Sequence, residues 1–292
     1  KQLEQKKNGS GFIAALDQSG GSTPKALENY GVTGDDYNND EEMFDQVHEM
    51  RARIMTCDCF DDKRVLGAIL FEDTMEREVN GKPTANYLWE DKNIVPFLKV
   101  DKGLAEQMSG VQVMRPIPNL DLLLDKAKNY PVFGTKMRSV IYEPNVDGIE
   151  LVVQQQFDVA KQIISKGLMP IVEPEVNIDS AEKHKCELLL KADILRNLDR
   201  LNDDHQVMLK LTLPEEDGFY KELIDHPKVL KVFALSGGYS RSAACDKLKQ
   251  NPGMIASFSR AFTEGLSKQQ SDEDFADTIN TSIEEIYEAS KV

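Results

Sequence analysis

Eight short apolar runs, each about as long as a β-strand, recur along the chain with longer amphipathic stretches between them. The runs are residues 11–17, 65–71, 94–100, 131–137, 168–174, 206–212, 229–235 and 254–259. Strands that alternate with helices build a parallel sheet, whose strands are covered on both faces and are therefore almost continuously apolar. An open doubly wound sheet would show the same alternation. The count of eight favours the closed (β/α)8 form, the TIM barrel.

Two of the intervening stretches have clear helical patterns. In 149–164 the apolar residues return on one helical stripe, and Gly167 is placed to end the helix. The second helix is predicted over 180–201, with Asp179 or Ser180 as its N-cap. No linker, low-complexity tract or charge block divides the chain, so residues 1–292 are expected to form a single barrel domain.

Charge and cysteine usage limit the function classes. A net charge of -15 argues against nucleic acid or an anionic membrane as the main partner, because both need a basic surface. An anionic small molecule stays open if positive charge gathers in a pocket. The four cysteines have neither CxxC spacing nor a secreted framework, which indicates reduced thiols in the cytoplasm. The apolar stretch FIAAL is too short for a signal peptide or a membrane span, so no targeting segment is expected.

Charged residues in five of the runs gather toward the C-terminal end of each run. They are Asp17, Lys99 with Asp101, Lys136 with Arg138, Glu173 with Glu175, and Lys210. In a barrel the C-terminal ends of the strands carry the active site. Residues two apart on a strand share a face, so the members of each pair are expected to point the same way. A single pair is as readily a salt bridge on an edge strand, but its recurrence over five strands favours an active site.

The loops after the last two strands and after the first suggest anion binding. Ser236, Gly237 and Gly238 follow the seventh run directly, and Arg260 lies just beyond the eighth. Barrel enzymes often bind phosphate in these two loops, and arginine suits a bidentate contact with phosphate. An SGG sequence alone usually makes only a turn, and the neighbouring Arg260 is what favours phosphate. Ser19 and Ser22 form a second Ser/Gly-rich loop that could receive another anionic group.

Lys210 stands in the middle of the apolar run QVMLKLT. A buried ammonium must find a partner, reach the surface or lose its proton. Alternation places Met208, Lys210 and Thr212 on one face of the strand, the inner face of a barrel. Desolvation and a nearby cation such as Lys136 favour the neutral amine, which can attack a ketone. With Glu173 as general acid and base and Glu175 orienting it, the pattern predicts Schiff-base chemistry on a phosphorylated carbonyl compound.

Metal and nucleotide chemistry find no matching motif. The four histidines show no HxH or HxxxH pairing, so a zinc site is not expected. Neither GxGxxG nor GxxxxGK[ST] follows a strand, so no nucleotide cofactor is expected. The sequence therefore predicts an enzyme without metal or cofactor.

The strand-end motifs AALDQSGGS, AILFEDT, FLKVDKG, GTKMR, IVEPEV, MLKLT, LSGGYS and SFSRA occur in this order over nearly the whole chain. In this order they resemble the motifs of class I fructose-1,6-bisphosphate aldolases. The resemblance implies a TIM barrel that reversibly cleaves fructose 1,6-bisphosphate into dihydroxyacetone phosphate and glyceraldehyde 3-phosphate in glycolysis. It implies a phosphorylated sugar as substrate and leaves a homo-oligomer open.

The resemblance also implies roles for single residues. Lys210 of MLKLT would form the Schiff base with the ketone carbon. Glu173 of VEPE would transfer protons with support from Glu175, and Asp17 would position the hydroxyl that loses its proton during cleavage. The implied residues that hold substrate charge or phosphate are Lys136, Arg138 and Lys99, then Ser236, Gly237, Gly238 and Arg260 for one phosphate, and Ser19 and Ser22 near the other.

Three positions depart from the better-known animal members of that family. Ala26 stands where they have an arginine, Leu211 replaces the usual proline after the Schiff-base lysine, and Tyr287 is not a terminal tyrosine. These differences resemble the shorter bacterial members, and Ala26 cannot make the charged contact to the second phosphate that the arginine implies. Two other hypotheses remain. Another Schiff-base barrel, such as a transaldolase or deoxyribose-phosphate aldolase, predicts one phosphate pocket, and a non-enzymatic scaffold predicts loss of a catalytic side chain, whereas all are present.

Overall fold

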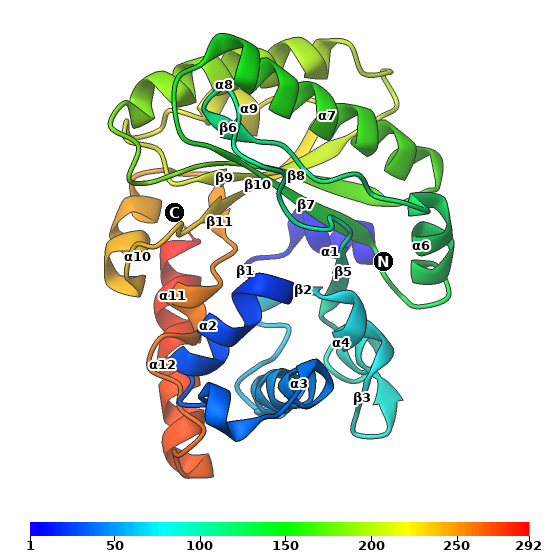
Figure 1. Ribbon diagram of the computed structural model, residues 1–292, viewed down its shortest axis with the longest axis vertical. Helices are drawn as coiled ribbons and strands as arrows, with labels where there is room; N and C mark the ends of the chain where they lie inside the picture. Colours follow the sequence, from blue (N-terminus) through cyan, green and yellow to red (C-terminus); the bar gives the residue numbers. More distant parts are fainter. Residues whose placement is uncertain (292) are drawn as a thin grey trace.

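Eight parallel strands form a barrel with helices around it (Figure 1). The computed structural model describes residues 1–291, apart from the side chains of residues 6–8. The strands, in the order in which they pair, are β1 (Phe12–Leu16), β2 (Val65–Leu70), β5 (Val95–Lys99), β7 (Gly134–Ile141), β8 (Met169–Val176), β9 (Val207–Thr212), β10 (Val229–Leu235) and β11 (Met254–Ala256). Ala15 N donates a hydrogen bond to Phe258 O at 3.4 Å, which joins the first strand to the segment after the last. The predicted TIM barrel is confirmed.

Each strand has an inner and an outer apolar face. The inner cluster fills the barrel and consists of Ile13, Leu66, Ile69, Val95, Phe97, Ile171, Met208, Phe233 and Ile255. Leu209 and Leu211 belong to the larger outer cluster, where the strands meet the helices. Met208 therefore lies inside the barrel and its neighbours outside, as strand alternation predicts, and Lys210 shares the inner face with Met208.

The helices of the outer ring follow the strands along the chain. They are α2 (Thr23–Asn29), α3 (Asp40–Thr56), α4 (Glu72–Glu76), α5 (Thr84–Asn86), α6 (Leu120–Ala127), α7 (Val146–Ser165), α8 (Lys183–Asp199), α9 (Lys221–Ile224), α10 (Arg241–Lys249), α11 (Arg260–Thr263) and α12 (Asp272–Ala289). α7 is the predicted helix over 149–164, and Gly167 follows its end with a φ of 82°. A further short helix, α1 (Gln2–Asn8), precedes the first strand.

The predicted N-cap of α8 is wrong. Neither Asp179 nor Ser180 caps the helix, which begins at Lys183 after Glu182 and has no side-chain cap. The Ser180 hydroxyl instead donates to Tyr142 O at 2.7 Å, so it fixes the loop after β8 to the neighbouring loop. Ser180 lies two residues before the N-cap position, Glu182, and so does not occupy the position whose side chain accepts from the first turn.

Several boundaries and small elements also differ from the sequence pattern. The fourth strand begins at Gly134 and continues to Ile141, beyond the apolar run 131–137. A two-residue strand, β6 (Val111–Gln112), pairs antiparallel with the end of β7. The hairpin β3 (Glu78–Val79) and β4 (Lys82–Pro83) is a second small sheet. Within residues 1–291, no helix has both the length and the apolar character needed to cross a membrane.

Candidate active site

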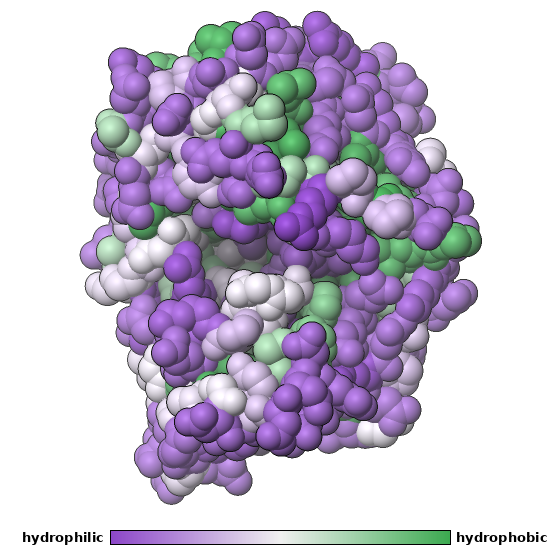
Figure 2. All heavy atoms as spheres, viewed as in Figure 1, coloured by the Kyte–Doolittle hydropathy of each residue, from purple (hydrophilic) through white to green (hydrophobic). Residues whose placement is uncertain are grey.

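A cavity of about 940 Å³ opens at the C-terminal ends of the barrel strands. Figure 2 shows the surface hollowed near the middle of the face that Figure 1 presents. Twelve of the thirteen side chains or glycines predicted for the site line this cavity, and they come from seven strand ends: Asp17, Ser19, Ser22, Lys99, Lys136, Arg138, Glu173, Glu175, Lys210, Ser236, Gly237 and Arg260. Gly238 is the predicted residue that is not among them. The barrel thus brings together positions up to 243 residues apart, from Asp17 to Arg260.

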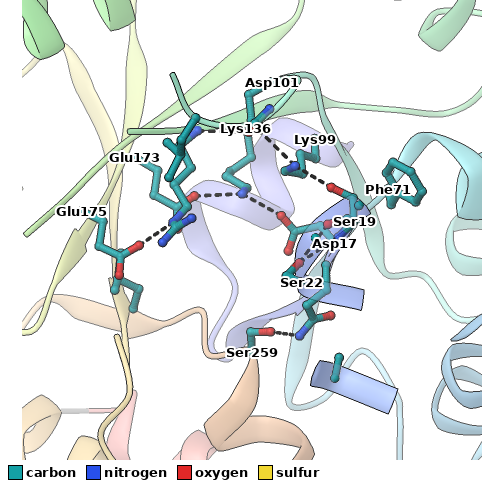
Figure 3. A pocket seen from close by; sticks show the side chains of 18 of the residues that line it. Asp17, Ser19, Ser22, Phe71, Lys99, Asp101, Lys136, Glu173, Glu175 and Ser259 are labelled. Carbon is teal, nitrogen blue, oxygen red and sulfur yellow. Dashed lines mark hydrogen bonds and ion pairs between the residues drawn. The ribbon is translucent and has the colours of Figure 1, made fainter. Parts of the chain in front are cut away.

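Four buried side chains at the centre of the cavity form one chain of ionic contacts. Lys210 Nζ lies 3.4 Å from Glu173 Oε1, and the other oxygen of that carboxylate lies 2.9 Å from Lys136 Nζ. Lys136 Nζ also lies 2.7 Å from Asp17 Oδ2, as the dashed lines of Figure 3 show. The exposed fraction of each side chain is 8% or less. Of the three fates open to a buried lysine, Lys210 therefore has a carboxylate partner.

The ionisation of Asp17 and Lys136 follows from this arrangement. Burial alone would raise the pKa of Asp17, but attraction to Lys136 and Lys210 holds that pKa well below its usual range. Burial alone would lower the pKa of Lys136, but Asp17 and Glu173 raise it well above its usual value. Lys136 is therefore a fixed ammonium between two carboxylates.

A second group of charges flanks these four side chains on two sides. Lys99 Nζ lies 3.1 Å from Asp101 Oδ1 and donates to Ser19 Oγ at 2.7 Å. Asp101 also accepts a hydrogen bond from Arg138 N at 3.1 Å. Arg138 Nε contacts Glu175 Oε2 at 2.5 Å. Burial alone would lower the pKa of Arg138, but the Glu175 carboxylate raises it above its usual value. The pairs predicted to share a face therefore do so, but Lys136 and Arg138 pair with carboxylates from other strands.

The two Ser/Gly loops lie at the rim of the cavity. Gly237 and Gly238 have φ angles of 61° and 118°, which L-residues rarely adopt. A Cβ on Gly238 would lie 3.7 Å from Arg260 Nη2, so this glycine lies beside the arginine even though it does not line the cavity. Ser22 Oγ donates to Ser19 O at 3.0 Å in the other loop. Gln18 and Ser259 are hydrogen-bonded, which ties the loop after β1 to the loop after β11.

Cations outnumber carboxylates in the lining of the cavity. Eight are Lys or Arg and five are Asp or Glu: Lys25, Lys99, Lys102, Arg115, Lys136, Arg138, Lys210 and Arg260 against Asp17, Glu72, Asp101, Glu173 and Glu175. The excess of three positive charges occurs in a chain whose net charge is -15. Positive charge concentrated in a pocket of an acidic protein favours an anionic ligand.

Sequence reasoning missed several residues of the site. Lys25, Lys102, Arg115 and Ser257 line the cavity, and none of them belongs to the predicted set. Lys231 breaks the rule that strand charges lie near C-terminal ends, because it lies in the first half of β10, where burial lowers its pKa.

Arg51 supports the floor of the site from α3 and was also missed. Its side chain is fully buried, and it donates to Thr74 Oγ1 at 2.7 Å and to Gln18 O at 2.5 Å. Burial lowers the pKa of Arg51 to about 10, against the attraction of Asp17 and Asp73. Its only sequence signal is an arginine on the apolar stripe of a helix, at a position where a core residue is expected.

The residues described here contain no group of three or more His, Cys, Asp or Glu side chains that could hold a metal ion. The carboxylates of the cavity are each paired with a lysine or an arginine instead.

The model of the glycolytic fructose-bisphosphate aldolase class I family matches residues 3–217. The chain belongs to the class I fructose-bisphosphate aldolase family. The enzymes of this family cleave fructose 1,6-bisphosphate through a lysine Schiff base and without a metal, as the strand-end motifs imply. The resemblance read from those motifs is therefore confirmed.

Solved structures show the same fold. A fructose-bisphosphate aldolase from Plasmodium falciparum, crystallised with TRAP and a small-molecule inhibitor, has a TM-score of 0.78 and 20% sequence identity; the match covers 99% of this chain and 92% of that one. An archaeal fructose-1,6-bisphosphate aldolase, whose catalytic lysine is covalently bound to the carbinolamine intermediate, has a TM-score of 0.50 and 10% identity over 98% of this chain and 100% of that one. Both support the barrel architecture.

Proposed function

We propose that Lys210 forms the Schiff base in this aldolase, that Glu173 transfers the protons, and that Lys136 and Asp17 hold charge and orient the substrate beside it. The observation that carries this proposal is the continuous chain of contacts from Lys210 through Glu173 and Lys136 to Asp17, buried at the strand ends. A nucleophilic lysine needs a base within reach and a group that orients the base. Glu173 and Lys136 fill these two places.

Imine formation begins with attack of the neutral Lys210 amine on the ketone carbon C2 of the open-chain sugar. Glu173 Oε1 faces the amine and is the group best placed to take up its proton. The same carboxyl then returns a proton to the carbinolamine hydroxyl, which leaves as water. The protonated imine accepts the electron pair of the C3–C4 bond when that bond breaks.

Asp17 acts at the other side of the breaking bond. Its low pKa keeps it ionised at neutral pH, and so acidic a carboxylate is a weak base. It therefore accepts a hydrogen bond from the C4 hydroxyl and orients it. Glu173, a carboxylate again once water has left, takes up the proton of this hydroxyl as the bond breaks, and Lys136, between Asp17 and Glu173, stabilises the charge that develops there. Glu175 fixes Arg138 beside them.

The register of the strands supports our proposal for the phosphate on C1. This phosphate is one carbon away from the imine and must lie near Lys210. Lys210 of β9 is paired with Phe233 of β10, and the loop Ser236–Gly238 begins directly after β10 ends. Ser236, Gly237, Gly238 and Arg260 then bind the C1 phosphate, and Ser19, Ser22 and Lys99 lie toward the other end of the sugar.

A covalent trap tests the assignment. Incubation with dihydroxyacetone phosphate and borohydride should leave a reduced adduct on the tryptic peptide that contains Lys210. The variant Lys210→Met should show neither adduct nor turnover while it remains folded. A label on another lysine, or none on the wild type, would refute the role of Lys210. Preference for monophosphorylated over bisphosphorylated sugars would instead favour a transaldolase-like enzyme.

The proposal extends to the cellular location of the protein and to its assembly. A glycolytic reaction and the four free cysteines support a cytoplasmic enzyme. The whole chain, residues 1–292, acts as one barrel domain, and a homo-oligomer of this domain is open to measurement by light scattering.

A further inference from the structure

Two guanidinium groups of the cavity differ from its other cations because they have no carboxylate partner. Each lysine of the lining forms an ion pair, and Arg138 pairs with Glu175. Arg115 and Arg260 form no side-chain hydrogen bond or ion pair with any described residue, although both line the cavity. A guanidinium has five donors and binds phosphate in a bidentate manner. The cavity thus presents two free groups of the kind that binds phosphate.

The segment that carries Arg115 is held on both sides by hydrogen bonds. Arg115 N donates to Gly103 O at 3.0 Å, which places it beside the loop that follows Lys99 and Asp101. On the other side, the Gln155 side chain of α7 accepts from Met114 N at 2.8 Å and donates to Met114 O at 2.9 Å. The backbone before this exposed arginine is therefore fixed, and only its side chain is free to close on a ligand.

Arg115 and Arg260 lie on different parts of the rim. Arg260 follows β11 and lies beside the Ser236–Gly238 loop, which follows β10, the strand between β11 and the Lys210 strand β9. Arg115 lies beside the loop after β5, on the side of Lys99 and Ser19. A sugar bisphosphate joined to Lys210 at C2 places its C1 phosphate near Arg260, and its chain must then extend toward the β1 and β5 ends.

We propose that Arg115 binds the distal, C6 phosphate and sets the preference of the enzyme for bisphosphates over monophosphates. This inference rests on the proposed function. It also accounts for Ala26, a lining residue of the same side that offers no charge of its own. Lys102 pairs with Glu72 at 3.1 Å, and Lys25 and Lys99 also have carboxylate partners, so among the described residues of the lining Arg115 is the cation on this side without one.

Comparison of two substrates tests the inference. Arg115→Ala should raise the KM for fructose 1,6-bisphosphate roughly 10- to 100-fold, as expected for loss of a charged hydrogen-bonding group. For fructose 1-phosphate, which lacks the C6 phosphate, kcat/KM should change by about twofold or less. Arg115→Lys, which keeps the charge but loses the bidentate geometry, should recover part of the affinity. Arg260→Ala, as the matched control, should impair both substrates.

The outcomes separate this inference from the proposed function. If the wild type forms no borohydride-trapped adduct with dihydroxyacetone phosphate, the proposed function fails. If it forms the adduct but Arg115→Ala loses activity equally on both substrates, or on neither, the role of Arg115 is refuted. The adduct itself should form equally in Arg115→Ala, because dihydroxyacetone phosphate has no distal phosphate.

A second feature, which does not belong to the lining of this cavity, is a pair of close thiols. Cys57 is the C-cap residue of α3, and its Sγ lies 2.8 Å from Sγ of Cys59. Both residues are half-buried, which leaves them open to small oxidants. The hydrogen bond with Cys59 lowers the pKa of the Cys57 thiol to about 6 against the effect of burial, and the pKa of the Cys59 thiol is raised. A thiolate beside a thiol is the arrangement of a reactive and a resolving cysteine.

We infer that Cys57 and Cys59 are a modification site that a peroxide converts to an intramolecular disulfide. The Cys57 thiolate attacks one peroxide oxygen and becomes a sulfenic acid, while the other oxygen leaves as hydroxide and becomes water. Cys59 then attacks the sulfenic sulfur, its proton and the hydroxyl leave as a second water, and the S–S bond forms. Two thiols and one hydrogen peroxide thus give one disulfide and two waters.

A single tryptic peptide reports this reaction. Trypsin cuts after Arg53 and after Lys63, so residues 54–63 contain both cysteines. After mild peroxide treatment this peptide should lose about 2 Da and resist alkylation until it is reduced. Cys186 and Cys245 should alkylate normally after unfolding. In Cys59→Ser the peptide should instead gain oxygen at Cys57. An unchanged peptide, or wild-type protein that gains oxygen without losing the two hydrogens, would overturn the inference.

Discussion

The buried charges at the centre of the site are balanced, and this makes a double-mutant cycle on Lys136 and Asp17 informative. Four cations and four carboxylates meet there: Lys99, Lys136, Arg138 and Lys210 with Asp17, Asp101, Glu173 and Glu175. Lys136 is 4% and Asp17 is 8% exposed, and their charged atoms are 2.7 Å apart. Removal of one partner leaves the other buried and uncompensated.

The expected magnitudes follow from this balance. Lys136→Met should lower the free energy of unfolding by about 3–5 kcal/mol, since one partner of a buried pair is lost. Asp17→Asn should cost a comparable amount, because Lys136 then faces Glu173 alone. In the double variant the two losses compensate, so we expect it to be more stable than the sum of the single losses by about 2–3 kcal/mol.

Urea or thermal unfolding followed by the fluorescence of Trp89, the single tryptophan, measures these differences. For a chain of this length about 1 kcal/mol corresponds to about 2 °C, so each single variant should unfold roughly 6–10 °C below the wild type. All three variants should be inactive, since both residues belong to the site. Strictly additive losses in the double variant would refute the reasoning, because they would mean that the two charges do not compensate each other in the fold.

Three further predictions address pH, loop geometry and metals. Because the pKa of Asp17 is lowered on folding, its ionised form stabilises the protein above the unfolded pKa of about 4, and this contribution is lost as the pH falls. The difference in free energy of unfolding between the wild type and Asp17→Asn should therefore become smaller when unfolding is measured at lower pH. A difference that does not change with pH would contradict the pKa shift. Gly237→Ala places a Cβ 2.9 Å from Ile178 Cγ2 at a φ of 61°, so it should cost about 1–2 kcal/mol in thermal unfolding and raise the KM for both mono- and bisphosphorylated sugars. Treatment with EDTA should leave kcat unchanged, and strong inhibition that added metal reverses would contradict the metal-independent mechanism.

The strand ends could be predicted because two rules act together on them. Parallel strands covered on both faces are mostly apolar, so charges such as Lys210 and Glu173 are expected near the C-terminal end, where the cavity opens; Lys231 of β10 is an exception. Side-chain alternation then fixes which face each charge occupies. These rules located the charged lining residues of five strand ends without any long-range information, and the loops after β10 and β11 were found from their Ser/Gly-rich sequence and Arg260.

The pairing of those charges could not be predicted in the same way. Alternation states that Lys136 and Arg138 point inward, but it does not state which neighbour each one meets. That depends on the stagger between strands, which sets Lys136 between Asp17 and Glu173 and places Arg138 beside Glu175. Arg115 lies beyond the reach of both rules, because its place depends on the path of a loop held by Gly103 and Gln155.

The two sets of charges around the cavity have different uses. The central cluster is neutral, so it can be buried without a net field and keeps its ions in fixed positions for proton transfer. Within the lining, the outer set of Lys25, Lys102, Arg115 and Arg260 is opposed by Glu72 alone, which gives the excess of three positive charges; Lys25 also pairs with Glu28 outside the lining. Each phosphate monoester carries about -1.5 to -2 at neutral pH, so a sugar bisphosphate brings about -3 to -4. The outer cations nearly neutralise the negative charge of a bisphosphate. A monophosphate would leave part of the positive charge of the cavity without a partner in the ligand. The rest of the protein, whose net charge is -15, has no excess of positive charge to add.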